Sequence, residues 1–368
     1  MTTLMPGDPA PWFVAAASNN PQFSFSTVAG RYIVLCFFGS AALPIAEQVL
    51  ADVAANRHRF SDDHAAFFGV SVDRADQSRP NVRALATSVR FFWDFDGNVS
   101  RLYGAMDPID RSSTQYRPFS IVLDPMLRVL RVYPMSSQEG HVAELLRYVD
   151  SLPPIGDLTP AAPQAPVLVL PRVFEPAFCR HLISLYQQHG GEDSGFMRER
   201  DGKTVRVLDH NHKRRSDYVI EDENVRKACQ ARILRRLVPE IKKAFQFEVT
   251  RMERYIVACY EAETRGHFRP HRDNTTKGTA HRRFAVTLNL NAEEFEGGEL
   301  RFPEFGPHTY KAPTGGAVVF SCSLLHEAMP VTKGTRYVFL PFVYDEAAAA
   351  IREANNKYLA EDVGEYRR

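Results

Sequence analysis

The first 150 residues carry short apolar runs separated by stretches of helical periodicity. The runs that predict strands are 32–38, 65–73, 89–94, 119–124 and 129–133. The stretches that predict helices are about 44–55, 80–87 and 138–150. Continuous apolar runs are typical of strands buried on both faces of a parallel sheet, and two runs flanking a turn indicate a hairpin. The pattern therefore predicts an α/β unit whose small sheet ends in a hairpin.

The rest of the chain follows a different pattern. The proline-rich stretch 151–166 predicts a semi-stiff linker. From Arg251 onward, short strands with Gly and Pro turns dominate, which indicates a double-stranded β-helix (a jelly roll of the cupin sort). Bracing elements are expected as a strand at 167–170 and helices at 175–188, about 223–245 and 346–359. The predicted fold class is α/β plus α+β, with domains at 1–150 and 167–368.

Composition favours packed cores. The chain has 368 residues, is 44% hydrophobic and carries a formal net charge of +1, so no nucleic-acid or membrane partner is expected. No apolar run approaches the ~20 residues of a membrane span, and no basic region followed by an apolar one marks the N-terminus. The cysteines lack metal or redox spacing and predict reduced thiols in a cytoplasmic protein. They are Cys36, Cys179, Cys229, Cys259 and Cys322.

One short motif carries the candidate chemistry. His271 and Asp273 are two positions apart, the spacing that puts two side chains on one face of a strand. His326 is the best candidate for a third metal ligand. Two histidines and a carboxylate with open positions describe the facial triad of non-haem Fe(II) oxygenases, although catalytic zinc accepts the same ligands. The His-x-Asp pair alone is near chance, so its context decides.

Arg336 lies ten positions after His326 in an otherwise apolar run. Residues 316–325 and 336–344 predict buried strands around a turn at 330–334, and an antiparallel pair would bring Arg336 back beside His326. A buried guanidinium needs an anion, and its planar fork suits a carboxylate. That anion is either a nearby Glu or Asp side chain or a bound carboxylate.

These residues, in this order, resemble the Fe(II)/2-oxoglutarate dioxygenases, in particular the prolyl 4-hydroxylase-like branch. The resemblance covers roughly residues 167–350. Its further blocks are Ile256–Tyr260, Leu288–Asn291, Gly297–Glu304 and Pro313–Gly316.

The resemblance implies a role for each matching residue. His271, Asp273 and His326 would hold Fe(II), and Arg336 would grip the distal carboxylate of 2-oxoglutarate. Tyr260 would hydrogen-bond the co-substrate, as would Asn289, which stands where some relatives carry a tyrosine. The implied reaction converts 2-oxoglutarate and O₂ to succinate and CO₂ while hydroxylating a prolyl, other peptidyl or small-molecule substrate. Ascorbate is the implied reductant.

The first unit resembles the peroxiredoxins, which have a thioredoxin-like fold. The resemblance rests on the lead-in 7–11, the strand 35–38 and the stretch 117–124. That family needs a peroxidatic thiolate at a helix N-terminus, activated by nearby donors and an arginine.

The residues of that chemistry are largely missing. Ala46 stands at the thiol position, Leu43 replaces a hydroxyl residue and Gly39 replaces a proline. Arg117 alone matches the helper arginine, and Cys36 lies inside a predicted buried strand. We therefore expect a scaffold without peroxidase activity that mediates homodimerisation or holds a partner.

Other functions remain open at this level. They are a thiol peroxidase run from the first unit, a metal-binding sensor without turnover, and a zinc hydrolase of the same fold. The basic stretch 210–215 predicts a solvated loop in preference to a site for an acidic substrate or nucleic acid, because no aromatic platform accompanies it. His267 and His281 are expected to be surface histidines near the site.

Overall fold

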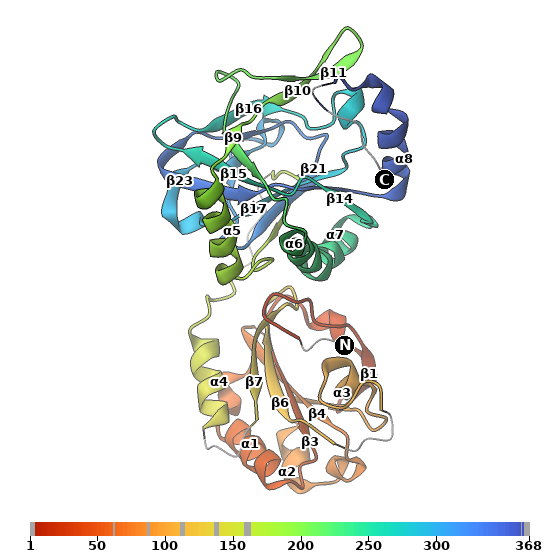
Figure 1. The fold of residues 1–368 in the computed structure, drawn as a ribbon. Helices are drawn as coiled ribbons and strands as arrows, with labels where there is room; N and C mark the ends of the chain where they lie inside the picture. Colours follow the sequence, from red (N-terminus) through yellow and green to blue (C-terminus); the bar gives the residue numbers. More distant parts are fainter. Residues whose placement is uncertain are drawn as a thin grey trace. The chain divides into compact units, whose positions relative to one another are not determined.

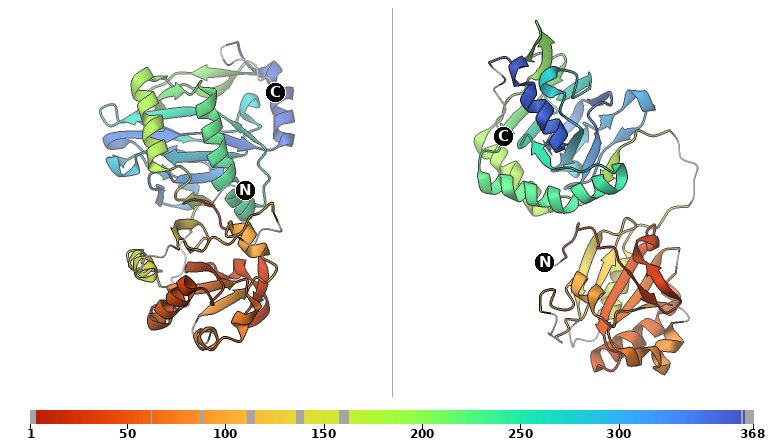
Figure 2. Two further views of the ribbon diagram at one scale, coloured as in Figure 1. Left: turned by 60° about the horizontal axis from the view of Figure 1, so that its bottom comes forward. Right: turned by 90° about the vertical axis from the view of Figure 1, so that its right-hand side faces the viewer.

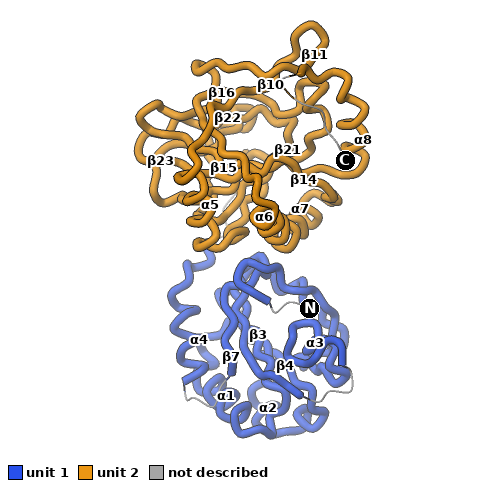
Figure 3. Tube along the Cα trace, in the orientation of Figure 1, with its two compact units in different colours: residues 1–159 blue, residues 160–368 orange. Residues whose placement is uncertain are grey.

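The computed structural model describes residues 4–61, 63–86, 89–110, 115–135, 140–157, 163–361 and 363. The chain divides into two compact units, residues 1–159 (unit 1) and 160–368 (unit 2), shown in Figure 3. The division falls inside the predicted linker, of which residues 158–162 lie outside the described residues. Within the described ranges, no helix combines the length and apolar character that crossing a bilayer requires.

Unit 1 is built on a mixed sheet in the order β2-β1-β5-β4-β3-β6-β7 (Figure 1). Its strands are β1 (Val14–Ala17), β2 (Asn20–Ser24), β3 (Tyr32–Gly39), β4 (Ala65–Ser71), β5 (Arg90–Trp93), β6 (Phe119–Leu123) and β7 (Val129–Pro134). Strand β3 pairs parallel with β4 and antiparallel with β6, and β6 forms the predicted hairpin with β7. The chain after the proline-rich lead-in adds β1 and β2, which its pattern did not predict.

Packing on both faces of this sheet explains its continuous apolar runs. Val34 and Phe38 of β3 enter one core cluster, whereas Ile33 and Phe37 enter another. Successive strand residues point to opposite faces, so both faces are covered, and each such side chain contributes about 1.5–3 kcal/mol on burial. The helices are α1 (Pro44–Ala55), α2 (Pro80–Leu85), α3 (Asn98–Tyr103) and α4 (His141–Asp150). The predicted α/β fold of this unit is confirmed.

Unit 2 contains two sheets that enclose a pocket, as the predicted jelly roll requires. The smaller sheet has the order β12-β16-β22-β19-β20. The larger has the order β14-β24-β17-β23-β15-β13-β9, with β21 paired to β17 and β8, and β18 paired to β23. The first strands are β8 (Leu168–Leu170), β9 (Glu192–Asp193), β10 (Phe196–Arg200), β11 (Lys203–Val207), β12 (Lys213–Arg214), β13 (Ser216–Val219), β14 (Arg251–Glu253), β15 (Ile256–Glu261) and β16 (His267–His271). The remaining strands are β17 (Phe284–Asn289), β18 (Phe295–Gly297), β19 (Leu300–Arg301), β20 (Thr309–Tyr310), β21 (Ala317–Ser321), β22 (His326–Ala328), β23 (Val331–Phe339) and β24 (Phe342–Tyr344).

Helices brace the larger sheet of unit 2. Figure 2 shows α5 and α6 side by side across it, and the Arg232 guanidinium of α6 lies 4.0 Å from the Phe178 ring of α5. The helices are α5 (Pro176–His189), α6 (Glu223–Arg236), α7 (Val238–Phe245) and α8 (Glu346–Ala354). The predicted helical stretch 223–245 divides into α6 and α7 just before Pro239, because proline suits a first helical turn but not an interior.

The hairpin predicted around residues 330–334 is wrong. Strand β21 pairs with β17 and β8, whereas β23 pairs with β15, β17 and β18. Residues 331–334, expected to be a turn, begin β23. Consecutive strands of a jelly roll cross between its two sheets, so strands adjacent in sequence are not partners. His326 and Arg336 therefore reach the same pocket from different sheets.

Candidate active site

Strands β16 and β22 place two histidines side by side. They pair antiparallel with His271 opposite His326, after a register shift that follows Phe268. The two imidazole centroids lie 4.3 Å apart. The ring of Phe268 stacks on His271, and that of Phe320 meets His326 edge-on. Apolar rings thus restrict the orientation of both imidazoles.

Backbone contacts determine which ring nitrogen of each histidine is free. Nδ1 of His271 lies 2.8 Å from the carbonyl oxygen of Arg269, and Nδ1 of His326 lies 3.0 Å from that of Leu324. A carbonyl oxygen only accepts, so each Nδ1 carries the proton and each Nε2 offers a lone pair. This is the tautomer that a histidine ligand of a metal adopts when a carbonyl supports its other nitrogen.

Asp273 completes the cluster, although its predicted place on the strand is wrong. Strand β16 ends at His271, and Asp273 lies in the turn that follows, where its N–H donates to the Cys322 carbonyl at 3.0 Å. Its Oδ1 is 3.6 Å from His271 Nε2, and its Oδ2 is 3.3 Å from His326 Nε2. The three donor atoms all lie within 4.8 Å of one another, which suits one metal ion.

Electrostatics favour the protonation states that a cation needs. Burial, reinforced by the neighbouring imidazole of His326, lowers the pKa of His271 to about 4. Burial acts to raise the pKa of Asp273, but attraction to the imidazoles of His326 and His271 outweighs it and holds that pKa well below its usual range. At neutral pH the cluster therefore offers a neutral imidazole at His271 and an ionised carboxylate, as divalent metal binding requires.

Arg336 projects into the same pocket from β23, where it pairs in register with Tyr260 of β15. Its side chain is almost fully buried, and its guanidinium lies 4.9 Å from the Tyr260 ring. Nε has no hydrogen-bond partner, and no carboxylate in the described part of the chain forms an ion pair with it. The alternative of a structural ion pair is therefore not observed. Gly298 makes room, because a Cβ there would lie 2.8 Å from Arg336 Cδ.

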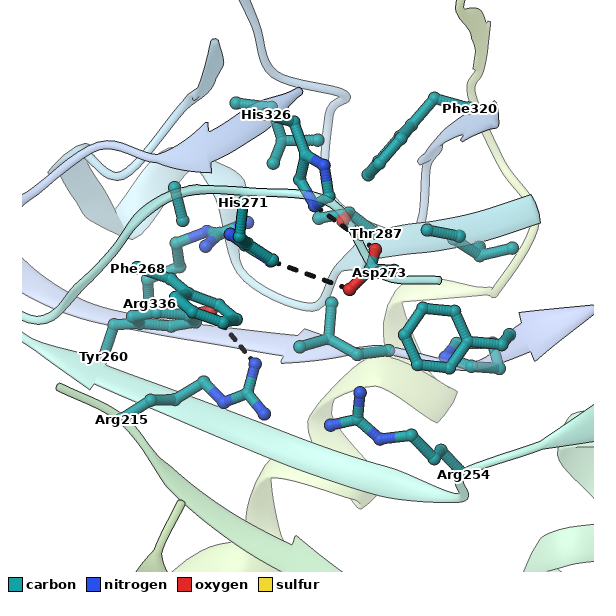
Figure 4. A pocket seen from close by; sticks show the side chains of 17 residues that line it. Arg215, Arg254, Tyr260, Phe268, His271, Asp273, Thr287, Phe320, His326 and Arg336 are labelled. Atoms are coloured by element: carbon teal, nitrogen blue, oxygen red, sulfur yellow. Dashed lines mark hydrogen bonds and ion pairs between the residues drawn. The ribbon is translucent and has the colours of Figure 1, made fainter. Parts of the chain in front are cut away.

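The two expected polar contacts to the co-substrate are placed differently. Tyr260 lines the pocket, and its hydroxyl accepts from Arg215 Nη1 at 3.3 Å (Figure 4). Asn289 is buried but does not line the pocket; its Nδ2 donates to the Ala312 carbonyl at 2.7 Å. Thr287, two positions earlier on β17, lines the pocket instead. The sequence singled out Asn289 by its place in the motif and gave no signal for Thr287.

The basic stretch 210–215 is not the solvated loop that the sequence predicted. Lys213 and Arg215 are buried, whereas Arg214 between them is exposed. The alternation is that of an extended segment with one face against the protein, and two-residue β12 is too short for its pattern to be recognised in advance. Arg215 lines the pocket, as does Arg254, which no sequence signal identified.

His267 and His281 are buried, so the expectation of surface histidines is wrong. His267 Nδ1 lies 2.9 Å from the Arg265 carbonyl. His281 Nε2 lies 3.1 Å from a carboxylate oxygen of Glu253. Neither histidine lines the pocket, and both act in local packing.

Unit 1 has a helix start at the position where the peroxiredoxins carry their reactive thiol, but it has no cysteine there. Ala46 lies in the first turn of α1 with no exposed surface. Arg117, the single match to the helper arginine, is exposed. Cys36 is fully buried, and burial raises its pKa to about 12, opposed by a hydrogen bond with Ser120. A protonated, inaccessible thiol cannot serve as the nucleophile.

The unit 2 residues fit a ferrous ion and a keto diacid. Two imidazole nitrogens and a carboxylate suit Fe(II) and leave coordination positions open. The orphaned Nε of buried Arg336 is the observation that calls for an anion in the pocket. A carboxylate would supply the missing partner, since it accepts two parallel hydrogen bonds from the guanidinium fork.

Comparison with known proteins finds a different family match in each unit. Residues 255–344 match the 2OG-Fe(II) oxygenase superfamily, and residues 6–134 match the AhpC/TSA family. A PKHD-type hydroxylase of Acaryochloris marina is 36% identical over 100 residues, which cover 27% of this chain and 44% of the relative. The chain thus spans less than half the length of the curated relatives it matches.

Solved structures give weaker likenesses to each unit. A prolyl hydroxylase from Trichoplax adhaerens, in complex with a hypoxia-inducible factor oxygen degradation domain peptide, is 17% identical with a TM-score of 0.39, covering 50% of this chain and 86% of that one. Peroxiredoxin Q of Xanthomonas campestris is 17% identical with a TM-score of 0.33, covering 38% of this chain and 90% of that one.

Proposed function

We propose that unit 2 is an Fe(II)- and 2-oxoglutarate-dependent hydroxylase, a proposal supported by the match of residues 255–344 to the 2OG-Fe(II) oxygenase superfamily. The observation that carries the proposal is one pocket containing both a His-Asp-His cluster and a buried guanidinium whose Nε has no hydrogen-bond partner. Its substrate is a prolyl or other peptidyl group or a small molecule.

Each residue has a distinct task in this proposal. His271, Asp273 and His326 would hold Fe(II) on one side of the ion. Bound there, Fe(II) supplies O₂ activation coupled to the conversion of 2-oxoglutarate to succinate and CO₂. Arg336 binds the co-substrate carboxylate remote from the metal, and Tyr260 beside it supplies a hydroxyl contact. Binding both ends of the co-substrate fixes its orientation.

The decisive experiment measures succinate formed from 2-oxoglutarate without added substrate. Protein purified without oxygen and loaded with Fe(II) and ascorbate should form succinate slowly. His271→Ala should reduce that rate at least ~100-fold, because loss of a first ligand removes metal binding. Exposed His308→Ala is the matched control and should behave as the unaltered protein.

The same preparation separates the alternatives. Metal analysis that finds zinc retained against Fe(II), with no succinate formed, would favour a hydrolase of this fold. Tight Fe(II) and 2-oxoglutarate binding without succinate would favour a sensor that does not turn over. Succinate formation that survives His271→Ala would contradict the proposed metal centre.

A further inference from the structure

The pocket contains more positive charge than one co-substrate needs. Its lining includes the guanidinium groups of Arg215, Arg254 and Arg336, whereas Asp273 is its carboxylate among the described residues. In Figure 4, Arg215 and Arg254 approach the pocket from the side opposite His326. A ferrous ion would add two positive charges and the 2-oxoglutarate dianion would cancel them, so the excess remains after both bind.

The carboxylate next to Arg215 and Arg254 already accepts several hydrogen bonds. Asp217 accepts from Arg215 through Nε–Oδ1 and Nη2–Oδ2 contacts of 2.7 Å each, and it also accepts from the Ser194 hydroxyl. Arg254 Nη2 is 3.7 Å from Asp217, beyond hydrogen-bond distance. One carboxylate thus lies near two guanidinium groups, and the N–H donors of Arg254 remain available to bind an anion.

Lys213 increases the positive potential at the same place. It is 4% exposed, and its Nζ donates to neutral oxygens, the Ser194 hydroxyl at 2.7 Å and the Gly195 carbonyl at 2.5 Å. Burial and the charges of Arg215 and Arg254 hold its pKa well below the usual range. A bound anion would stabilise the ammonium form of Lys213, which burial and the two arginines disfavour, so this cluster favours an incoming anion.

The backbone holds Arg254 in an unusual conformation. Its φ is +65°, a region that L-residues other than Asn and Asp rarely occupy. The preceding Glu253 is buried and fixed by Arg282 at 2.9 Å, His281 at 3.1 Å and Arg352 at 2.8 Å. This network fixes the end of β14 so that Arg254 leaves the strand toward the pocket. Such strain persists where the surroundings impose it, often at ligand sites.

We propose that Arg254, supported by Arg215 and Lys213, binds a carboxylate group of the substrate, an inference that rests on the proposed function of unit 2. Arg336, on β23 beside Tyr260, is assigned to the co-substrate, whereas Arg254 follows β14, so the two guanidinium groups are assigned to different molecules. The Arg254 side chain is 28% exposed, which leaves it accessible from solvent while it faces the pocket. The preferred substrate is therefore a carboxylate-bearing molecule.

A relaxation measurement tests this without knowledge of the substrate. Mn(II) replaces Fe(II), 2-oxoglutarate is saturating, and the proton relaxation of acetate and of neutral acetamide is compared. Water relaxation in the same tubes reports bound metal. Acetate should be relaxed specifically by the unaltered protein and acetamide should not. Arg254→Gln should weaken acetate binding roughly tenfold, because a hydrogen bond to a charged partner is lost.

The control and the opposing outcomes are defined in advance. Arg214→Gln, an exposed neighbour whose Nη1 contacts the Thr264 carbonyl, should relax acetate like the unaltered protein. Equal relaxation of acetate and acetamide, or of acetate by Arg254→Gln and unaltered protein, would overturn the inference alone. Weaker 2-oxoglutarate binding in Arg254→Gln, measured by calorimetry, would reassign Arg254 to the co-substrate. Absence of saturable metal and 2-oxoglutarate binding would overturn both this inference and the proposed function.

Discussion

Unit 1 surrounds the start of α1 with carboxylates, whereas unit 2 surrounds its pocket with guanidinium groups. In unit 1, the Ser40 hydroxyl donates to Asp73 at 2.7 Å and the Ala41 N–H donates to Asp76 at 2.9 Å. Arg79 pairs with both carboxylates, so the charges at this loop balance one another, unlike those of the unit 2 pocket. In unit 2, Arg336 is retained although its burial is unfavourable and lowers its pKa.

The sheet of unit 1 depends on apolar cores, as β3 illustrates, and such cores can stabilise a fold whatever its site does. In unit 2, the buried Arg336 has an Nε without a hydrogen-bond partner and shares a pocket with the His-Asp-His cluster, and this combination indicates a ligand. The comparison of the two units can therefore be tested by substitutions that affect the free energy of unfolding and the ligand binding or reactivity of each unit differently.

The largest effect is expected at Arg336. Arg336→Met should weaken 2-oxoglutarate binding about 10³-fold, since breaking a buried charge pair costs about 3–5 kcal/mol. The same substitution should stabilise the ligand-free protein by about 1–3 kcal/mol, because it removes a buried charge that has no carboxylate partner. Calorimetry measures the first quantity and denaturant unfolding the second.

Arg301→Met is the matched control for this pair of measurements. Arg301 is 41% exposed and its Nη1 is 3.2 Å from Glu327, so its loss should change stability by less than about 1 kcal/mol. If Arg336→Met binds 2-oxoglutarate as tightly as the unaltered protein, Arg336 does not bind the co-substrate carboxylate.

In unit 1, restoring the family's proline should be harmful. Gly39 has a φ of +80°, whereas proline is locked near about −65°, so Gly39→Pro should cost about 3 kcal/mol or more. Leu43→Thr also restores the family pattern, but Leu43 is extended and 46% exposed, so its cost should stay within about 0.5 kcal/mol. If urea unfolding shows that the two substitutions reduce stability equally, the loop before α1 has kept the backbone shape of the family.

Much of this architecture could be predicted from the sequence, because its signals are local. The apolar run of β3, the helix that begins at Pro44 and the β6–β7 hairpin follow from periodicity and turn residues. His271, Asp273, His326 and Arg336 were identified together through motif order. Their convergence at one pocket is an observation of the structure, and their roles remain predictions.

What the sequence concealed depends on tertiary context. Lys213 and Arg215 appeared to be solvated because β12 spans two residues and carries no readable period. Arg254 reaches the pocket with a positive φ, and no local sequence pattern predicts that backbone conformation. The β21–β23 pairing failed because sheet partners in a jelly roll are chosen by topology, not by adjacency.

A smaller effect concerns acid stability of unit 2. Glu175, which precedes α5, contacts Arg232 at 2.7 Å and Arg236 at 2.8 Å. Burial acts to raise its pKa, but these guanidinium groups outweigh it and lower the pKa to about 2. A folded pKa below the unfolded one gives stability that is present above about pH 4.5 and is lost as the pH falls toward about 2.

The measurement compares unfolding of the unaltered protein and Glu175→Gln across pH. The variant should be about 1–2 kcal/mol less stable at neutral pH, a value discounted for solvent screening at a site that is 32% exposed. The gap should narrow from about pH 4.5 toward about pH 2, as the carboxylate protonates first in the unfolded and then in the folded state. A gap that is constant over this range would show that the pairing does not depend on ionisation.

The smallest effect, on peroxide consumption, is expected at position 46, where unit 1 differs from the peroxiredoxins at the reactive residue itself. Ala46→Cys restores the family's thiol in the first turn of α1, where the helix dipole favours a thiolate. The position has no exposed surface, and the same core raises the pKa of Cys36 to about 12 by burial. The new thiol should therefore remain protonated and give no peroxide consumption above background. Leu43→Cys, on an exposed side chain, is the control and should label readily with a thiol reagent. Peroxide reduction by Ala46→Cys that exceeds that of Leu43→Cys would mean that unit 1 still holds a functional thiol site.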